Sequence, residues 1–307
     1  MEEVKVSVIV PNYNHASFLK QRLDTVLNQS FQDFELIILD DCSTDNSREI
    51  IETYRNHVKV SHISYNSTNS GSTFKQWKKG IELAKAELIW IAESDDYADI
   101  NFLATLVDKF KDETVSLAYC RTISLYEDGK QVICTWGESI QPKLWDTDNQ
   151  FDGKDFINSF LKYRNVIPNA SAVIFKKKYF EDIEPILKMR YTGDWLLWVK
   201  IVARGNVAYS AKPLNYFRFH SASTRSRKSL KEEKRKMQEY FISINEACAK
   251  AACRFNAFDK TYGYIIHFWI KESKVFGLKR SLRPPFPFLF LLKFYYALLN
   301  SKYSSDS

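Results

Sequence analysis

The chain of 307 residues is 45% hydrophobic, so it can bury the core of one large domain or of two smaller ones. Its 9 Gly and 8 Pro are too few for a collagen-like or disordered chain, and its five scattered Cys predict free thiols in a reducing compartment. Residues 1–175 hold 18 Lys and Arg against 26 Asp and Glu, whereas residues 176–307 hold 26 against 11. The acidic first half argues against a chain that binds nucleic acid along its whole length.

The first hundred residues alternate between apolar strand patterns and amphipathic helix patterns. Strands are predicted at 4–11, 34–39, 58–65 and 88–97, and helices at 17–29, 43–54 and 74–85. This alternation predicts a parallel, doubly wound α/β sheet. Because the loops at the carboxyl ends of parallel strands converge, we expect a nucleotide pocket within residues 1–105.

The remaining elements alternate less regularly. Strands are predicted at 115–125, 131–136, 170–176, 207–210 and 214–220, and helices at 102–111, 156–161, 196–202 and about 228–253. The last of these helices opens with a charge run over residues 228–236, which is typical of a solvated helix face.

The fourth strand pattern, LIWIAESDDY at 88–97, ends in three carboxylates, those of Glu93, Asp95 and Asp96. Hard oxygen ligands at a strand end suit Mg²⁺ or Mn²⁺ holding a diphosphate, although the same residues also fit a solvated acidic turn. The turn after the first strand, residues 11–15, has neither the Gly-rich dinucleotide pattern nor a P-loop. Hydride transfer with NAD is therefore not expected, and a diphosphate bound here needs a metal.

Two further strand-end positions are candidates for nucleoside contacts. The Asp40-Asp41 pair follows the second strand, where a carboxylate can accept hydrogen bonds from a ribose or base, or can simply start the next helix. Tyr13 can stack on a base, or it can pack against its neighbours.

Five sequence blocks resemble, in the expected order, the family 2 glycosyltransferases: VSVIVPNYNHASFLKQRLDTVLNQSFQDFELIILDDCSTDNS, NSGST, ELIWIAESDD, GDWLLW and YFRFHSAST. Members of this family are inverting, nucleotide-sugar-dependent enzymes. The resemblance implies the GT-A fold, an α/β fold with a Rossmann-like, doubly wound, mainly parallel sheet, a smaller acceptor-side sheet and C-terminal helices. Residues 1–105 would form the nucleotide-sugar-binding half, 106–225 the acceptor-binding half of the same domain, and 226–307 a basic, aromatic-rich helical extension.

The resemblance also assigns site residues, position by position. The nucleotide-sugar contacts would be Pro11, Asn12, Tyr13, Asp41, Asn69, Gly71, Glu93 and Asp95. The metal ligands would be Asp95 and Asp96, with His220 beside the diphosphate and the metal, which would be Mn²⁺ or Mg²⁺. The catalytic base would be Asp194, and Trp195 would lie on the acceptor side.

The chemistry agrees with these roles. Inversion at the anomeric carbon takes a single displacement, so one carboxylate must remove the proton of the acceptor hydroxyl. Asp194 lies between Gly193, expected to be flexible, and Trp195, on whose ring a sugar can stack. The metal would neutralise charge on the departing nucleoside diphosphate. As alternatives, Asp194 caps the helix that follows it, and His220 is purely structural.

The sequence departs from the family pattern at three places. Glu93 replaces the more usual Asp, and Gly193 stands where an acid often precedes the base. Trp77 and Lys78, in the segment FKQWKKGI, replace a common Arg-Asn pair, and we assign no site role to them.

The carboxyl-terminal segment 279–299 joins basic residues to the apolar run FPFLFLLKFYYALL. The run is too short and interrupted to span a bilayer, but it suits a contact with the inner membrane surface; packing on the domain is the alternative. With no signal segment before the first strand, we expect a cytoplasmic protein, either free or peripheral on the cytoplasmic membrane face.

These features predict a metal-dependent, inverting glycosyltransferase of surface polysaccharide or glycoconjugate biosynthesis. It would move a sugar from a nucleoside diphosphate, with UDP favoured, to a hydroxyl of a glycan or a lipid-linked glycan. The alternatives are a catalytically silent nucleotide-sugar-binding protein and, less favoured, a nucleotidyltransferase; nucleic acid is not an expected partner.

Overall fold

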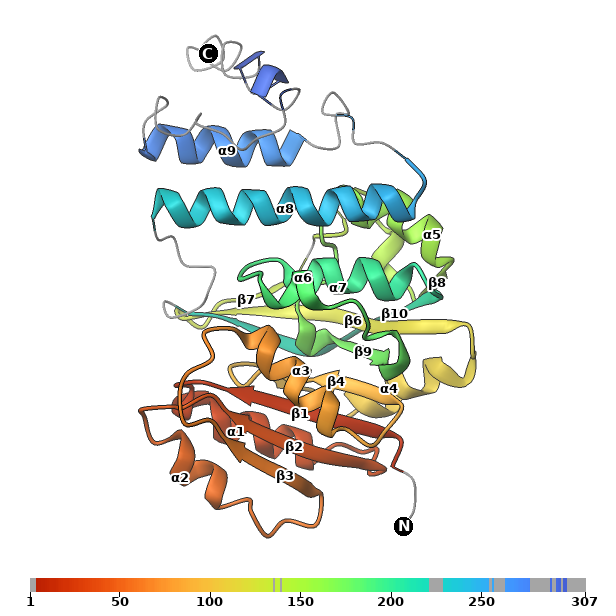
Figure 1. Cartoon of the computed structure of the whole chain (residues 1–307). Coiled ribbons are helices and arrows are strands. Elements are labelled where there is room, and N and C mark those ends of the chain that lie inside the picture. The colour runs from red at the N-terminus through yellow and green to blue at the C-terminus, as the bar shows by residue number, and fades with distance from the viewer. Residues whose placement is uncertain are drawn as a thin grey trace.

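The computed structural model describes residues 4–134, 136–138, 140–220, 229–253, 256, 263–276, 288, 291–293 and 295–296. Within these residues, a ten-stranded sheet has the order β3-β2-β1-β4-β9-β6-β10-β5. The two remaining strands pair outside this order, β7 with β6 and β8 with β10. Helices cover both faces of the sheet, and α7, α8 and α9 lie in successive layers on one of them (Figure 1).

The amino-terminal half of the sheet is doubly wound, as predicted. Its elements are β1 (Val6–Asn12), α1 (Ala16–Leu27), β2 (Phe34–Asp40), α2 (Ser47–Glu52), β3 (Val60–Tyr65), α3 (Thr73–Leu83) and β4 (Leu88–Ile91). β1 pairs in parallel with both β2 and β4, and β2 pairs in parallel with β3. The chain therefore winds outward from β1 to β3 and returns on the other side of β1 as β4, which opens a crevice at the carboxyl ends of β1 and β4.

The fourth strand is shorter than predicted, because β4 ends at Ile91 instead of continuing to Tyr97. The following residues turn out of the sheet, and the Asp96 N–H donates to the Glu93 carbonyl oxygen at 3.2 Å. All four residues of β4 are buried in the sheet, whereas Asp96 in the turn accepts hydrogen bonds from Asn169, Ser171 and the Arg218 N–H. The turn instead carries the acids into the crevice.

The second half of the chain extends the same sheet. Its strands are β5 (Tyr97–Ala98), β6 (Val115–Tyr126), β7 (Gln131–Ile133), β8 (Asn149–Phe151), β9 (Val173–Lys176) and β10 (Asn206–Phe219). Its helices are α4 (Phe102–Asp108), α5 (Gly153–Phe156) with the π-helical turn η3 (Ile157–Leu161), α6 (Glu184–Leu187), α7 (Gly193–Val202), α8 (Leu230–Lys250) and α9 (Gly263–Phe276), and its 3₁₀ turns are η1 (Lys109–Lys111), η2 (Leu144–Asp146), η4 (Ala170–Ala172) and η5 (Lys177–Tyr179). The acceptor-side strands, expected as a smaller sheet, are thus continuous with the first half through β9, which pairs antiparallel with β4 and β6.

One predicted boundary is wrong for a clear reason. The two short strands expected at 207–210 and 214–220 are one strand, β10, which pairs with β6 along its length and shifts register around Pro213. Proline cannot donate a ladder hydrogen bond, so a bulge accommodates it without ending the strand.

Alternate residues of the strands contribute to two hydrophobic clusters, one on each face of the sheet. Val8 joins the cluster that α1 and α4 cover, whereas Ile9 joins the cluster that α3, α7 and α8 cover. The charge run at the start of α8 is only partly solvated, because Glu233 within it is 7% exposed; beyond it, Met237 is fully buried and Glu239 is 4% exposed. Helix α8 therefore packs on the domain, and its Lys236 and Tyr240 line the crevice.

Candidate active site

A cavity of about 790 Å³ lies at the carboxyl ends of β1 and β4. Of the predicted site residues, Pro11, Asn12, Tyr13, Asp41, Asn69, Gly71, Glu93, Asp95, Asp96, Asp194 and Trp195 line it. His220 reaches the same place from the end of β10, where its ring lies against Asp95. The two halves of the chain therefore contribute to one cavity.

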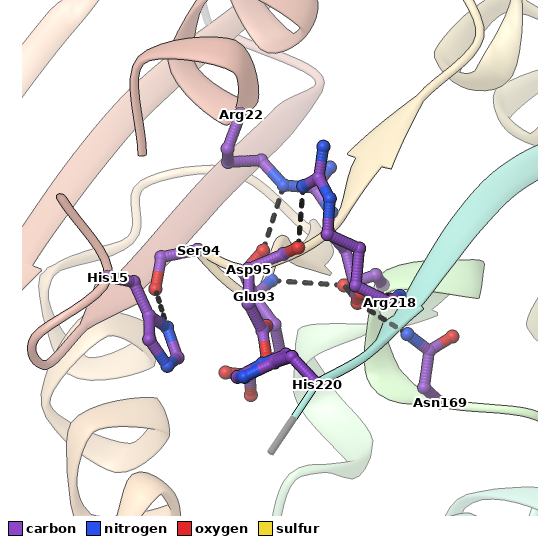
Figure 2. A network of polar contacts seen from close by, with 10 residues as sticks. His15, Arg22, Glu93, Ser94, Asp95, Asn169, Arg218 and His220 are labelled. Carbon is purple, nitrogen blue, oxygen red and sulfur yellow. Dashed lines mark hydrogen bonds and ion pairs between the residues drawn. The ribbon is translucent and has the colours of Figure 1, made fainter. Parts of the chain in front are cut away.

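His15, Asp95 and His220 form the cluster best suited to bind a metal (Figure 2). Their ligand atoms all lie within 4.8 Å of one another, and His220 Nε2 is 3.0 Å from Asp95 Oδ2. The His15 ring is oriented by a 2.8 Å hydrogen bond between Nδ1 and Ser94 Oγ. His15 belongs to the PNYNH turn after β1, and the sequence prediction did not include it as a ligand.

The environment shifts the pKa of each residue of this cluster. Burial lowers the pKa of His15, which keeps its ring neutral and able to coordinate. Burial alone would raise the pKa of Asp95, but the hydrogen bond from His220 and the two imidazoles lower it, so the carboxylate is ionised. The same hydrogen bond raises the pKa of His220.

Asp96, predicted as a metal ligand, lies outside this three-residue cluster. Its Oδ2 accepts hydrogen bonds from Asn169 Nδ2 at 2.5 Å and Ser171 Oγ at 2.7 Å, and its Oδ1 accepts one from the Arg218 N–H at 3.0 Å. Burial and the neighbouring Asp95 raise the pKa of Asp96 to about 7. In this geometry, Asp96 joins the acidic turn to β10 and to the loop before β9.

Glu93 is held by two side chains of α3. The indole N–H of Trp77 donates to Glu93 Oε1 at 2.7 Å, and Thr73 Oγ1 donates to the same atom at 3.3 Å. Burial, with the charge of Asp95, raises the pKa of Glu93 to about 8. Two of the three departures from the family pattern therefore involve residues in contact with each other. Glu93, which is longer than the usual Asp, is hydrogen-bonded to Trp77, which replaces a residue of the usual Arg-Asn pair.

Two arginines hold the acidic turn through hydrogen bonds to its backbone carbonyl oxygens. Arg22, fully buried on α1, donates from Nε to the Glu93 carbonyl oxygen at 2.9 Å, and Arg218 donates from Nη1 to the Asp95 carbonyl oxygen at 2.7 Å (Figure 2). Burial lowers the pKa of Arg22 to about 10, although Asp96 and Asp95 oppose the shift. Sequence reasoning missed both residues, because one Arg in a helix or strand pattern gives no sign of what it faces.

Asp41 organises the loop after β3. Its carboxylate accepts four hydrogen bonds of 2.6–2.9 Å, from the side chains of Asn66, Ser70 and Gln76 and from the Ser70 N–H. Asn69 Nδ2 donates to the Asp41 carbonyl oxygen at 3.1 Å, and Gly71 has a φ of +71°, which glycine adopts without strain. The same network thus positions three of the residues predicted to contact the nucleotide.

The neighbouring turn after β1 is fixed in a similar way. Asn12 is 2% exposed and donates from Nδ2 to Asp40 Oδ1 at 2.8 Å, whereas Tyr13 next to it is 44% exposed. A buried amide below an exposed ring leaves the Tyr13 face available at the wall of the cavity.

Asp194 lies in the first turn of α7. Its Oδ1 accepts the Trp195 N–H at 2.7 Å, and its Oδ2 accepts Asn165 Nδ2 at 3.2 Å, so the carboxylate pairs one first-turn N–H of the helix and lines the cavity, whereas the N-cap is Thr192. Gly193 was expected to be flexible, but it is buried, and a Cβ there would lie 2.6 Å from the Phe74 ring. Glycine is needed for close packing of α7 on α3, and this contact ties Asp194 to the nucleotide half.

Trp195 exposes little ring surface for a sugar. It is 2% exposed, its indole N–H donates to the Leu161 carbonyl oxygen at 2.9 Å, and its ring lies 5.7 Å from that of Tyr240. Tyr240, Trp136 and Phe217 also line the cavity and are only half-buried. Their rings offer more accessible surface than the predicted one.

Helix α8 holds the segment that leads to Asp194. The Glu239 carboxylate accepts three backbone N–H groups, from Arg190 at 2.9 Å, Tyr191 at 2.7 Å and Thr192 at 3.1 Å. Arg235, one turn earlier on α8, donates to Glu239 at 3.2 Å. Sequence reasoning did not identify Glu239, which lies just beyond the charge run at the start of α8.

The doubly wound sheet, with a crevice at its switch point and antiparallel strands that continue it, agrees with the predicted GT-A fold. A crystal structure of S. aureus TarS residues 1–349 with UDP-GlcNAc superposes with a TM-score of 0.65 at 21% identity, covering 97% of this chain and 79% of that one. The corresponding complex with UDP gives a TM-score of 0.61 at 22% identity, covering 88% and 77%. These similarities confirm the predicted fold.

The profile described as "Glycosyl transferase family 2" matches residues 7–183, and the chain belongs to this family. The protein named TuaG of Bacillus subtilis, assigned to teichuronic acid biosynthesis, is 37% identical over 204 residues, which cover 66% of this chain and 74% of TuaG. An uncharacterized glycosyltransferase of Nostoc sp. is 26% identical over 226 residues, 72% of this chain. The chain spans less than two thirds of that Nostoc protein, at 66%, and 17% of the poly(ribitol-phosphate) beta-N-acetylglucosaminyltransferase TarS of Staphylococcus aureus, to which it is 38% identical over 96 residues.

Across the described part of the chain, every helix is too short or too polar to cross a bilayer. The segment 279–299 lies mostly outside the described residues. Of its described side chains, Phe288, Leu292, Tyr295 and Tyr296 are exposed, by 43% to 72%.

Proposed function

We propose that this protein is a metal-dependent, inverting glycosyltransferase that moves a sugar from a UDP-sugar to a hydroxyl of a glycan. The observation that carries the proposal is one cavity that adjoins a His–Asp–His cluster, built from His15 and Asp95 of the first half and His220 at the end of β10, and that is also lined by a carboxylate in the first turn of α7. In glycosyl transfer, a cation stabilises the negative charge of the leaving diphosphate and a base takes the proton of the attacking hydroxyl. Both groups must therefore lie in the same cavity.

The donor set fits a divalent cation, with His15, Asp95 and His220 as the residues that would hold it. The 4.8 Å limit between their ligand atoms needs only a small adjustment of the side chains to close on one ion. Two imidazoles with one carboxylate favour Mn²⁺ over Mg²⁺, which prefers oxygen ligands. When bound, the ion would supply positive charge for the departing diphosphate.

Asp194 is the proposed base. Asn165 and the start of α7 hold its carboxylate in place and stabilise its negative charge, so it can accept the proton of an acceptor hydroxyl. Because α7 belongs to the second half, the hydroxyl would approach the sugar from the side opposite the diphosphate, as inversion requires.

The nucleoside would lie on the first half. Tyr13 would stack on the base, and Pro11, Asn12, Asp41, Asn69 and Gly71 would shape its pocket, with Glu93 near the ribose. The two TarS crystal structures are complexes with UDP and with UDP-GlcNAc, which supports UDP as the nucleotide here. Residues 1–105 would then be the donor half and 106–225 the acceptor half of one domain.

The acceptor is proposed to be a surface glycan, either free or lipid-linked, as the names of TuaG and TarS suggest. The exposed apolar side chains within 279–299 support a contact with the inner membrane surface, where a lipid-linked acceptor would be found. This would place the protein peripherally on the cytoplasmic face.

The test is a panel of UDP-sugars with Mn²⁺, read by UDP release and by thermal shift. We expect one donor to raise the melting temperature and to release UDP, with Mn²⁺ more effective than Mg²⁺. Stabilisation without UDP release, in the presence of any acceptor extract, would indicate a silent binding protein. Release of pyrophosphate from UTP and a sugar phosphate would indicate a nucleotidyltransferase.

The metal assignment has its own test. Asp95→Ala should weaken UDP binding with Mn²⁺ by at least about tenfold and should abolish the difference between Mn²⁺ and EDTA, because the cluster loses its only anionic ligand. Calorimetric titration of UDP with and without Mn²⁺ measures this. A UDP affinity that is unchanged in the variant would remove Asp95 from the metal site.

A further inference from the structure

The charged residues that line the cavity are separated by sign. The acids on the first half are Asp41, Glu93, Asp95 and Asp96. The second half contributes three cations, Arg164, Arg190 and Lys236, and among the described lining residues Asp194 is its one acid. A site for a neutral glycan hydroxyl has no need of such a wall.

The three cations lie on three different segments of the chain, and each segment contacts or adjoins Asp194 or its neighbour Trp195. Arg164 precedes Asn165, which hydrogen-bonds Asp194. Arg190 lies in the segment that Glu239 fixes just before α7. Lys236 is one turn before Tyr240 on α8, and the Tyr240 ring contacts Trp195, the residue after Asp194.

Two acids of α8, Glu233 and Glu239, lie beside this wall. Lys236 Nζ is 3.9 Å from Glu233 Oε2, a distance longer than a hydrogen bond, and 5.0 Å from the centre of the Phe268 ring. Glu239 is occupied by three backbone N–H groups and by Arg235. Among the described residues that line the cavity, this wall therefore carries three cations and one acid.

We propose that Arg164, Arg190 and Lys236 form a subsite for an oxyanion, a phosphate or a carboxylate, carried by the acceptor. The proposal rests on the proposed function and names the class of its acceptor: an anionic glycan whose charged group lies next to the hydroxyl that is glycosylated. Guanidinium groups bind phosphate and carboxylate through paired N–H donors, and the cationic wall would draw an anionic polymer toward the base.

The donor diphosphate is the competing ligand for these cations. The His15–Asp95–His220 cluster already offers a place where a metal would meet the diphosphate, whereas the three cations come from segments that contact or adjoin the segment of the proposed base. The base must lie on the acceptor side of the sugar, opposite the diphosphate. This geometry assigns the cations to the acceptor.

The experiment first fills the donor site with UDP and Mn²⁺, so that added anions cannot bind there. Glucose, glucose 6-phosphate and glucuronate are then titrated by ligand-observed NMR. We expect both anionic sugars to bind about tenfold more tightly than glucose, roughly the effect of one charge-assisted hydrogen bond. The phosphate and the carboxylate arms show which oxyanion is preferred.

Two variants and one control locate the effect. Arg190→Gln and Lys236→Gln should each reduce the preference for the anionic sugars severalfold while UDP affinity stays unchanged. The control Lys212→Gln removes an exposed cation of β10 that does not line the cavity, and it should change neither value.

Two results overturn the proposal. One is equal binding of charged and neutral sugars by the unmodified protein. The other is a loss of UDP affinity in the Arg190→Gln and Lys236→Gln variants, which would give the cations to the donor diphosphate. Failure of the proposed function is separate, since it would appear as no UDP binding in the first step, and the comparison of sugars could still be made without UDP.

Discussion

The cavity has two walls, one proposed to bind the donor (the donor wall) and one proposed to bind the acceptor (the acceptor wall), and they are built from different kinds of structure. The donor wall consists of turns at the ends of parallel strands, and each turn is fixed by hydrogen bonds to buried side chains such as Asp40, Asp41 and Arg22. The acceptor wall consists of helix ends and a segment held by Glu239 of α8. The family match ends at residue 183, so the donor wall lies inside it, whereas Asp194 and α8 lie beyond it. The difference suggests a donor site defined by the fold and an acceptor site defined by this chain's own helices.

The largest expected effect comes from replacing Asp194, the proposed catalytic base in the acceptor wall. Asp194→Asn should reduce the turnover rate by roughly 10²–10⁴-fold, because an amide cannot take the hydroxyl proton. The affinity for UDP with Mn²⁺ should stay within about twofold, because the donor wall is untouched. Single-turnover kinetics and UDP titration measure the two quantities.

The matched control is Asp155→Asn, which alters an exposed acid in the first turn of α5, outside the cavity. It should leave turnover unchanged. Retained turnover in Asp194→Asn would leave that residue with only a structural role in the first turn of α7.

The donor wall is also the part that sequence reasoning could predict. Hydrophobic period and turn position placed β1 to β4 within a few residues, and acids at strand ends pointed to Asp41, Glu93 and Asp95. Those signals are local, because a strand end and its turn are adjacent in the chain. The fold follows from the same local patterns.

Partnerships across the chain could not be predicted in this way. His15 meets Asp95 and His220 only because β1, β4 and β10 end at one place, and Glu239 meets the 190–192 segment only after α8 packs on α7. Trp77 and Glu93 illustrate the one usable signal, since both depart from the family pattern and are in contact. Two departures in one sequence can indicate a contact that neither residue reveals alone.

A moderate effect should follow from loosening the acceptor wall without touching its base. Glu239→Gln replaces one carboxylate oxygen, which accepts backbone N–H groups, with an NH₂ donor that faces them. We expect kcat to fall about tenfold through misplacement of Asp194, with UDP affinity unchanged. Steady-state kinetics with a UDP titration separate the two walls.

Glu246→Gln is the control on the same helix, because Glu246 lies 3.9 Å from Lys200 of α7 and 3.6 Å from Lys250, both through side chains. It should cost some stability without the drop in kcat. If Glu239→Gln lowered UDP affinity as much as kcat, the two walls would not be independent.

The smallest effect concerns the donor wall and pH. Burial and Asp95 raise the pKa of Glu93 from an ordinary 4.5 to about 8, so the folded protein holds a proton there that the unfolded chain loses at lower pH. Stability from this proton is complete below about pH 4.5 and is lost as pH rises toward 8, at up to about 1.4 kcal/mol for each pH unit in that window. The metal-free protein should therefore melt at progressively lower temperature from pH 5 to pH 8.

Glu93→Gln should flatten this decline, because a neutral amide can still accept the Trp77 indole N–H but has no proton to lose. Asp96, with a pKa raised to about 7, would retain part of the slope. The control Glu35→Gln removes a buried acid of β2 whose pKa is lowered: burial opposes the shift, but hydrogen bonds from Ser7 and the Lys85 N–H outweigh it. Since that stability is lost only as pH falls below the ordinary value of 4.5, its slope between pH 5 and 8 should match the unmodified protein. The measurement is thermal unfolding in EDTA from pH 5 to pH 8. If the melting temperature of Glu93→Gln fell with pH as steeply as that of Glu35→Gln, Glu93 would not hold a proton in the folded protein.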